Sequence, residues 1–299
     1  MPELPDVTLY CEALDARVTG TRLEEVEVRN PFVLRTVDPP LADCAGRRVV
    51  AVRRVGKRIA LGLEGERWLV IHLMVAGRLA WSDSGRQPRG GKALARFGFA
   101  RGALFLTEAG SKRRASLHVL AGAEAWRDCD PGGLEIPGCD LAAFAARLTA
   151  ANHTLKRALT DPHIFSGIGN AYSDEILHAA RLSPVTLTQK LDAAEIARLH
   201  AAAQAVLASW TARLREACGD EFPGKVTAFR EGMAVHGRYG QPCPHCGTAV
   251  QRIRYADAEL NYCPRCQCGG RLYADRALSR LLHRDWPRTI EALESRGSS

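Results

Sequence analysis

The first residues of the chain carry groups that could perform covalent catalysis. Met1 is followed by Pro2 and Glu3, and then by a second proline and Asp6. Because Pro2 is a small second residue, we expect removal of Met1, which would leave a secondary amine at the N-terminus. An α-amino group titrates near neutral pH, so much of it is unprotonated and able to attack a carbonyl, giving a Schiff base while Glu3 moves protons. The alternative is that these prolines and acids only begin a helix.

Two cysteine pairs near the other end of the chain have the spacing of a metal site. Cys243 and Cys246 form one C-x-x-C pair, and Cys263 and Cys266 form the second, with sixteen residues between the pairs. Four thiolates of this kind form a tetrahedron, which is typical of a closed structural zinc site. Cys268 and His245 stand close by and are alternative ligands. We therefore expect one structural Zn²⁺, held by a finger whose β-hairpin lies between the pairs.

A glycine-rich turn, Ser166–Asn170, leads into a helix. Such a turn alone only begins a helix, but the N-terminus of a helix is also a binding site for phosphate. The third glycine of a dinucleotide fingerprint is missing, and the preceding residues have the pattern of a helix and a turn, so a nicotinamide site is excluded. In a basic chain we expect Gly169 and Asn170 to hold a nucleic-acid phosphate, and Lys156 to reach the same phosphate.

Charge and composition favour a polyanionic partner. The formal net charge is +8 over 299 residues, and arginine, whose fork suits phosphates, dominates the basic residues. Lys57 lies in one basic cluster, Arg53–Arg58, and Arg113 in another, Lys112–Arg114, although such runs are usually solvated hairpin tips. We find no apolar run that could span a membrane and no export signal, so the ten cysteines are expected to be reduced.

The pattern of elements divides the chain into regions. Residues 6–19 are predicted to be a helix, and short apolar or alternating runs up to about residue 120 predict an antiparallel sandwich or barrel-like domain. These runs are Leu23–Arg29, Arg47–Arg53, Arg58–Leu63, Trp68–Leu73, Gly77–Trp81, Ala93–Phe99 and Ala103–Thr107. Helices are predicted after residue 140, the longest beginning at Asp192 with a capping box and ending at Gly219. The tail is expected to form one more helix, around Leu278–Leu282.

Taken together, these pieces resemble the formamidopyrimidine-DNA glycosylase / endonuclease VIII family from Pro2 to about Cys266. The resemblance rests on five motifs in the same order. They are PELPDV at the start, RRVGKRIALGLEG around Lys57, IHLMVAGRL from Ile71, LKRALTDPHIFSGIGNAYSDE from Leu155, and VHGRYGQPCPHC into the first cysteine pair. It implies an α+β multidomain fold, with an N-terminal helix and antiparallel β-sandwich, a helix–two-turn–helix domain and a C-terminal zinc finger. The expected limits are 1–130, 131–233 and 234–273, with a helical tail at 274–299.

The resemblance also implies roles for particular residues. Pro2 would attack C1′ of a damaged nucleotide, Glu3 would be the general acid and base, and Lys57 would contact the lesion nucleotide and its phosphate. Lys156, Gly169 and Asn170 would hold a backbone phosphate. The implied function is that of a base-excision-repair DNA glycosylase with AP lyase activity, with double-stranded DNA that carries a damaged base or an abasic site as its partner. A monomer in the cytoplasm, associated with the nucleoid through DNA, is expected.

Some positions depart from the family pattern. An arginine usually stands five residues before the third cysteine, where this chain has Ala258, and Arg254 or Arg265 would have to replace it. Val75 occupies the place expected for a void-filling methionine. In the second void-filling loop, Glu108–Ser116, Arg113 or Arg114 is the candidate arginine, and the expected phenylalanine is missing. Such departures concern the choice of lesion more than the chemistry. The alternative function is a zinc-finger protein that binds damaged or abasic DNA without cutting it.

Overall fold

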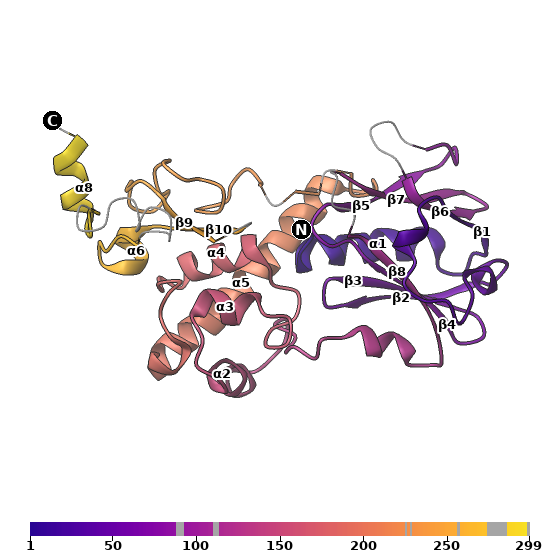
Figure 1. Ribbon diagram of the computed structural model, residues 1–299, viewed down its shortest axis with the longest axis horizontal. Coiled ribbons are helices and arrows are strands. Elements are labelled where there is room, and N and C mark those ends of the chain that lie inside the picture. Colours follow the sequence, from indigo (N-terminus) through magenta and orange to yellow (C-terminus); the bar gives the residue numbers. More distant parts are fainter. Residues whose placement is uncertain are drawn as a thin grey trace. The chain divides into compact units, whose positions relative to one another are not determined.

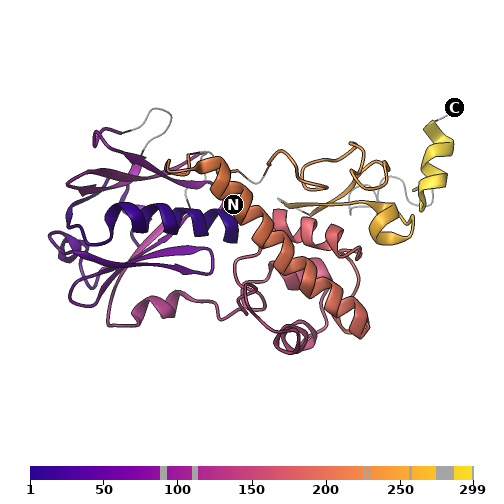
Figure 2. The same ribbon diagram turned by 180° about the vertical axis from the view of Figure 1, so that it is seen from behind.

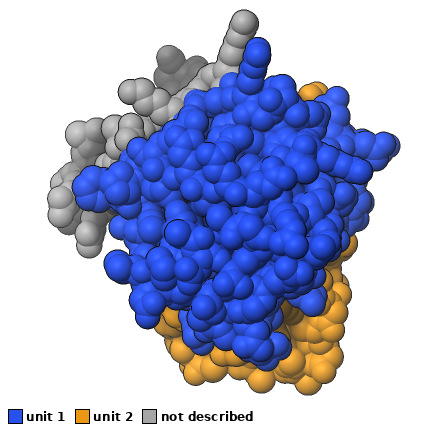
Figure 3. Space-filling view, turned by 90° about the vertical axis from the view of Figure 1, so that its right-hand side faces the viewer, with its two compact units in different colours: residues 1–131, 209–228 blue, residues 132–208, 229–299 orange. Residues whose placement is uncertain are grey.

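The computed structural model describes residues 1–87, 93–109, 114–224, 226–227, 229–255, 258–273 and 286–297. It contains two compact units, which Figure 3 colours separately. The first comprises residues 1–131 and 209–228, and the second comprises residues 132–208 and 229–299. The four domain limits expected from the sequence remain a prediction.

The first unit contains a helix and two antiparallel sheets (Figure 1). In the described part of the chain, one four-stranded sheet has the order β1-β6-β7-β5 and the other the order β2-β3-β4-β8. The elements are α1 (Leu4–Val18), β1 (Leu23–Val28), β2 (Val49–Val55), β3 (Arg58–Leu63), β4 (Arg67–His72), β5 (Gly77–Ser82), β6 (Ala93–Phe99), β7 (Gly102–Glu108) and β8 (Ser116–Ala121), with short 3₁₀ turns η1 (Pro31–Val33), η2 (Leu41–Cys44) and η3 (Ala125–Cys129). Strand β8 was not among the predicted strands. It pairs with β4 and forms one edge of its sheet.

Helix α1 lies between the two sheets (Figure 2). Its buried side chains recur every three or four residues, at Val7, Tyr10, Leu14 and Val18, and they join the core between the sheets. The Tyr10 hydroxyl also lies 3.4 Å from the carbonyl oxygen of Leu79 in β5. This packing fixes the position of the helix that directly follows the N-terminal residues Met1–Glu3.

The second unit contains short helices and a two-stranded hairpin. Its helices are α2 (Leu141–Thr149), α3 (Leu155–Thr160), α4 (Asn170–Ala179), α6 (Pro264–Cys268) and α8 (Ile290–Gly297), with a 3₁₀ turn η4 (Thr188–Lys190). Strands β9 (Gln251–Tyr255) and β10 (Ala258–Tyr262) form the hairpin between the two cysteine pairs, as predicted. The long helix α5 (Ala193–Cys218) contributes residues to both units.

Local signals located these helices well. The predicted capping box of α5 is confirmed, because the Glu195 N–H donates to the Asp192 carboxylate at 2.7 Å and the Asp192 N–H donates to Glu195 at 3.1 Å.

The expected fold class, with its N-terminal helix, antiparallel sheets, helical region and finger, is also confirmed. The predicted helix at Leu278–Leu282 lies outside the described residues. Within the described ranges, no helix has the length and apolarity needed to cross a membrane.

Candidate functional site

The N-terminal residues are buried at the start of α1. Pro2 and Asp6 are buried, and Glu3 is only 2% exposed. The backbone N–H of Glu3 donates to Asp6 Oδ2 at 2.9 Å, so the acid of the first helical turn fixes the backbone next to Pro2. Because a carboxylate is costly to bury without charged or polar partners, the position of Glu3 marks a site where opposite charges gather.

Lys57 supplies one of those charges. It follows Gly56 in the tight turn between β2 and β3, where Gly56 adopts a φ of +57° that favours glycine. Lys57 is half-buried and does not extend into solvent as a hairpin-tip lysine usually does. Burial lowers the pKa of the Lys57 ammonium, the nearby Glu3 carboxylate opposes this shift, and Arg58 adds to it. Glu3 and Lys57, 54 positions apart in the sequence, are thus electrostatic neighbours in the fold.

The N-terminal amine belongs to the same group of charges. Burial lowers the pKa of the Met1 amine, and Arg78 and Lys57 lower it further, while Glu3 and Asp6 act in the opposite direction. A lowered pKa leaves more of an amine unprotonated near neutral pH, which is the form that attacks a carbon centre. Arg78 was missed by the sequence reasoning, although it stands inside the quoted motif that begins at Ile71.

In the loop after β4, the structure shows which of the two candidate void-filling side chains is exposed. Val75 is 59% exposed, whereas Met74 is half-buried and has a positive φ of 52°. The backbone conformation therefore presents Val75, and not Met74, at the surface of the loop. Arg113, the candidate of the second loop, lies outside the described residues.

In the second unit, the predicted glycine-rich turn leads into α4. Gly167 has a φ of +80°, Gly169 is the N-cap of the helix and Asn170 is its first residue. The positive end of the helix dipole is therefore at Asn170, which is partly exposed. The Asn170 side-chain amide donates to the carbonyl oxygen of Glu259 at 2.7 Å, so this end of α4 is joined to the finger hairpin.

Lys156 lies against the same helical turn. Its ammonium lies 2.7 Å from the Asn170 carbonyl oxygen, 2.8 Å from Ser173 Oγ and 2.6 Å from Asp174 Oδ1. An ammonium has three N–H donors, and these three contacts account for all of them. Lys156 thus holds the turn together, and contact with a phosphate would require it to exchange one of these partners.

Two buried carboxylates of α4 hold the segment that precedes the finger. Glu175 accepts backbone N–H groups from Val235 and His236, at 2.9 and 3.0 Å. Asp174 Oδ2 lies 2.7 Å from His236 Nδ1 and accepts the backbone N–H of Asn261 at 3.1 Å. The sequence reasoning missed both acids, since neighbouring acids on a helix usually indicate an exposed face.

The four predicted cysteines meet in one cluster. Their sulfur atoms all lie within 4.8 Å of one another, and no other group of metal-binding side chains of this kind occurs in the described ranges. Cys243 Sγ is 3.9 Å from Cys266 Sγ, and Cys246 Sγ is 3.4 Å from Cys263 Sγ. A tetrahedron with zinc–sulfur bonds of about 2.3 Å has edges of about 3.8 Å, so the cluster fits Zn²⁺. Four thiolate ligands close the coordination sphere, which makes the zinc structural.

The basic groups of the finger hairpin are paired with an acid. Arg254 is 59% exposed, and its Nε lies 3.3 Å from Glu259 Oε2. Arg252 Nη1 lies 3.4 Å from the same oxygen, and its guanidinium stacks on Tyr239 at 4.1 Å. Glu259 therefore offsets much of the positive charge of the hairpin.

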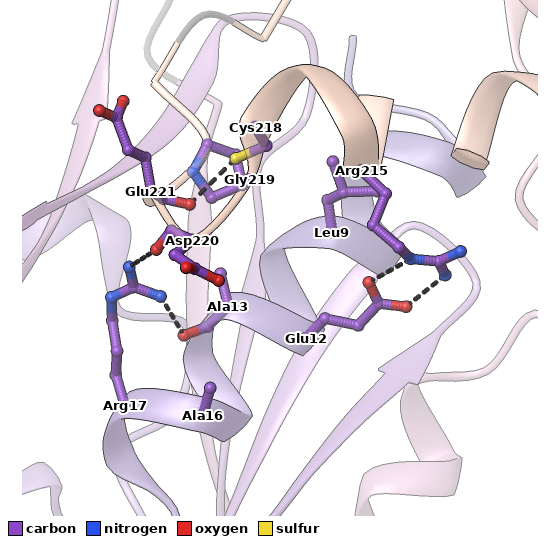
Figure 4. A pocket seen from close by; sticks show the side chains of 11 residues that line it. Leu9, Glu12, Ala13, Ala16, Arg17, Arg215, Cys218, Gly219, Asp220 and Glu221 are labelled. Atoms are coloured by element: carbon purple, nitrogen blue, oxygen red, sulfur yellow. Dashed lines mark hydrogen bonds and ion pairs between the residues drawn. The ribbon is translucent and has the colours of Figure 1, made fainter. Parts of the chain in front are cut away.

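A small pocket of the first unit lies where the end of α5 meets α1 (Figure 4). Its charged side chains contact one another across the two helices. Glu12 accepts two hydrogen bonds from the Arg215 guanidinium, at 2.9 and 2.6 Å, and Arg17 donates to the Asp220 carbonyl oxygen at 2.6 Å. These contacts fasten the end of α5 to α1.

Comparison with known proteins agrees with this geometry. Residues 1–113 match the formamidopyrimidine-DNA glycosylase N-terminal domain, residues 135–214 match the H2TH domain of the same enzymes, and residues 240–267 match the zinc finger found in FPG and IleRS. The formamidopyrimidine-DNA glycosylase of Moorella thermoacetica is 34% identical over 263 residues, which are 85% of this chain and 95% of the relative. The chain belongs to the formamidopyrimidine-DNA glycosylase family.

Other members of the family agree in extent and in fold. The formamidopyrimidine-DNA glycosylase of Acidothermus cellulolyticus is 34% identical over 291 residues, covering 89% of this chain and 97% of the relative. A solved complex of Lactococcus lactis Fpg with DNA containing an abasic site has a TM-score of 0.78 at 21% identity, covering 89% of this chain and 99% of that one. The formamidopyrimidine-DNA glycosylase fold thus extends over nearly the whole chain.

Proposed function

We propose that this chain is a base-excision-repair DNA glycosylase with AP lyase activity, acting on double-stranded DNA with a damaged base or an abasic site. One observation carries the proposal: the Met1 amine, whose place the Pro2 amine takes once Met1 is removed, forms one electrostatic group with buried Glu3 and half-buried Lys57 at the start of α1. The relatives named above are formamidopyrimidine-DNA glycosylases, and the Lactococcus lactis complex contains an abasic site. Their names support this assignment of substrate class.

In the proposed reaction, the Pro2 nitrogen of the mature chain attacks C1′ of the damaged nucleotide. The C1′–base bond breaks, and the base leaves with the bonding electrons and takes up a proton. Opening of the sugar ring, with a proton delivered to its oxygen by Glu3, gives the iminium ion. Loss of a C2′ proton then expels the 3′ phosphate, and a second elimination expels the 5′ phosphate. Water hydrolyses the remaining iminium and restores the amine.

Lys57 would contact the substrate next to the Pro2 amine and Glu3. A half-buried ammonium next to Glu3 can donate to a phosphate of the lesion nucleotide while its charge favours the unprotonated amine. Removing the target nucleotide from the stack costs a few kcal/mol, and damaged or unpaired bases lower that cost. Such selectivity operates before any chemical step.

We further propose that the start of α4 binds a backbone phosphate through Gly169, Asn170 and the helix dipole. Lys156 would support this turn from within, since its ammonium contacts Asn170, Ser173 and Asp174. Arg254 would also bind a DNA phosphate, and to do so it would have to give up its contact with Glu259. Each exposed cation that binds a phosphate releases counterions, so affinity should fall steeply with salt.

Borohydride trapping on an abasic-site duplex tests the proposal. The wild-type chain should give a covalent protein–DNA adduct, with the cross-linked peptide beginning at Pro2, and a cut strand on a denaturing gel. Pro2→Gly should nearly abolish the adduct, whereas Pro5→Ala, in the first turn of α1, should retain it. Undiminished trapping by Pro2→Gly, or an adduct mapped to another residue, would reject the role of Pro2. A shift in binding without cutting would instead support the non-catalytic alternative.

A further inference from the structure

The C-terminal turn of α4 lies against the first cysteine pair. His178, in that turn, places its Nε2 atom 3.3 Å from Cys243 Sγ, which is within hydrogen-bond distance for sulfur. Cys243 is only 2% exposed, and His178 is half-buried. The contact is therefore largely screened from water. A hydrogen bond to a charged acceptor is stronger in such a screened place than at an open surface.

A second contact joins the same two segments. Arg181 has a φ of +54°, uncommon for a residue other than glycine, and its Nη2 lies 2.8 Å from His245 Nε2. A guanidinium can only donate, so His245 Nε2 is the acceptor. His245 stands between Cys243 and Cys246 in the sequence, yet it is absent from the four-sulfur cluster. It contacts the end of α4 instead of binding the metal.

His178 is likewise no member of the cluster. A zinc ion with four thiolate ligands carries a formal charge of −2, and the sulfur atoms retain much of that charge. A donor outside the coordination sphere draws off part of it and fixes the ligand's orientation. Loss of such an outer partner typically weakens metal binding by about 10- to 100-fold.

We propose that the His178 Nε2–H donates to the zinc-bound thiolate of Cys243, so that α4 retains the structural zinc and fixes the first cysteine pair. The helix then carries a separate contact at each end. Asn170 at its start contacts Glu259 in the hairpin, and His178 in its last turn contacts Cys243. The finger is thereby fastened to α4 at two places about 12 Å apart along the helix.

Zinc transfer from the full-length protein to a chromogenic chelator tests the role of His178. His178→Phe keeps an aromatic ring but removes the donor, and it should weaken zinc retention by about 10- to 100-fold. His178→Gln can still donate an N–H and should restore most of the retention. His153→Phe, in the same unit and with no sulfur contact among the described residues, is the matched control. Equal retention in the wild type and in His178→Phe would overturn the proposal.

A measurement on the wild-type chain keeps the test independent of variant folding. In protein loaded with ¹¹³Cd, ¹⁵N-resolved NMR of the histidine rings should show a slowly exchanging Nε2 proton on His178, coupled to the metal through Cys243 Sγ. An imidazole of His178 that carries its only proton on Nδ1 would contradict the proposal. Neither measurement depends on glycosylase activity.

Discussion

Lys156 and Asp174 form a buried ion pair, with Nζ and Oδ1 2.6 Å apart and side-chain exposures of 12% and 0%. Removing one partner of such a pair leaves the other charge uncompensated, which typically costs about 3–5 kcal/mol. The pair also shares its environment with His236, whose Nδ1 lies 2.7 Å from the second Asp174 oxygen. Lys156 is therefore a structural support of the proposed phosphate site at the start of α4.

The variant Lys156→Met should accordingly lower the free energy of unfolding by about 3 kcal/mol, because Asp174 loses its ammonium partner. Urea unfolding followed by circular dichroism measures this loss. The exposed neighbour Arg157 offers a matched control, since Arg157→Met should change stability by about 0.5 kcal/mol or less. Adding Asp174→Asn to Lys156→Met should recover part of the stability. A cost for Lys156→Met no larger than that for Arg157→Met would refute the prediction.

The pH dependence of Schiff-base trapping should report the charges around the N-terminal amine. Arg78 lowers the pKa of the Met1 amine. We expect the same direction for the Pro2 amine that removal of Met1 leaves at this place, so Arg78→Gln should raise the pKa of that amine. Trapping requires the unprotonated amine. The rate should therefore rise with pH through the pKa, and the midpoint of Arg78→Gln should lie at higher pH than that of the wild type.

The control for that experiment is Arg101→Gln, which removes an exposed arginine from the turn between β6 and β7. Its midpoint should equal that of the wild type, and both variants should approach their plateau at high pH. A midpoint of Arg78→Gln that stayed in place or moved to lower pH would contradict the charge arrangement.

Zinc content should distinguish the ligand cysteines from their neighbour. Cys263 belongs to the four-sulfur cluster, whereas Cys268 lies outside it on α6. Elemental analysis should find one zinc per wild-type chain, one in Cys268→Ser, and a much lower content in Cys263→Ser. Loss of zinc from Cys268→Ser with retention in Cys263→Ser would reverse the assignment.

Glu259 should limit the affinity of the finger for DNA. Its carboxylate contacts both Arg252 and Arg254, so Glu259→Gln should free positive charge for phosphates while keeping the side-chain shape. Binding to an abasic-site duplex should tighten, and the slope of log affinity against log salt should steepen by about 1 for each additional phosphate that the finger neutralises. Glu216→Gln, on the exposed surface of α5, removes the same charge elsewhere. Equal affinities of the two variants would show that Glu259 has no such role.

Short-range patterns in the sequence were sufficient for the zinc ligands, the capping box of α5 and the turn into α4. Each depends on residues close together in the chain, whose backbone geometry brings the functional atoms within reach of one another. The C-x-x-C spacing predicts two cysteine turns because the residues of each pair approach the metal from one short turn. The sequence analysis missed strand β8, whose position at the edge of its sheet depends on hydrogen bonds to the distant strand β4.

Only the tertiary structure decided which charges meet. Glu3 is the N-cap of a helix and Lys57 lies in a turn between two strands. Asp174 lies on a helix and His236 in a distant loop. No periodicity links such positions, and an acid on a helix has the same local pattern whether it is exposed or buried. The sequence by itself therefore predicted the candidate reactive groups and the four clustered cysteines of this glycosylase family member. The packing of the sandwich and the helical region determined their partners, because burial makes a charge depend on the groups that enclose it.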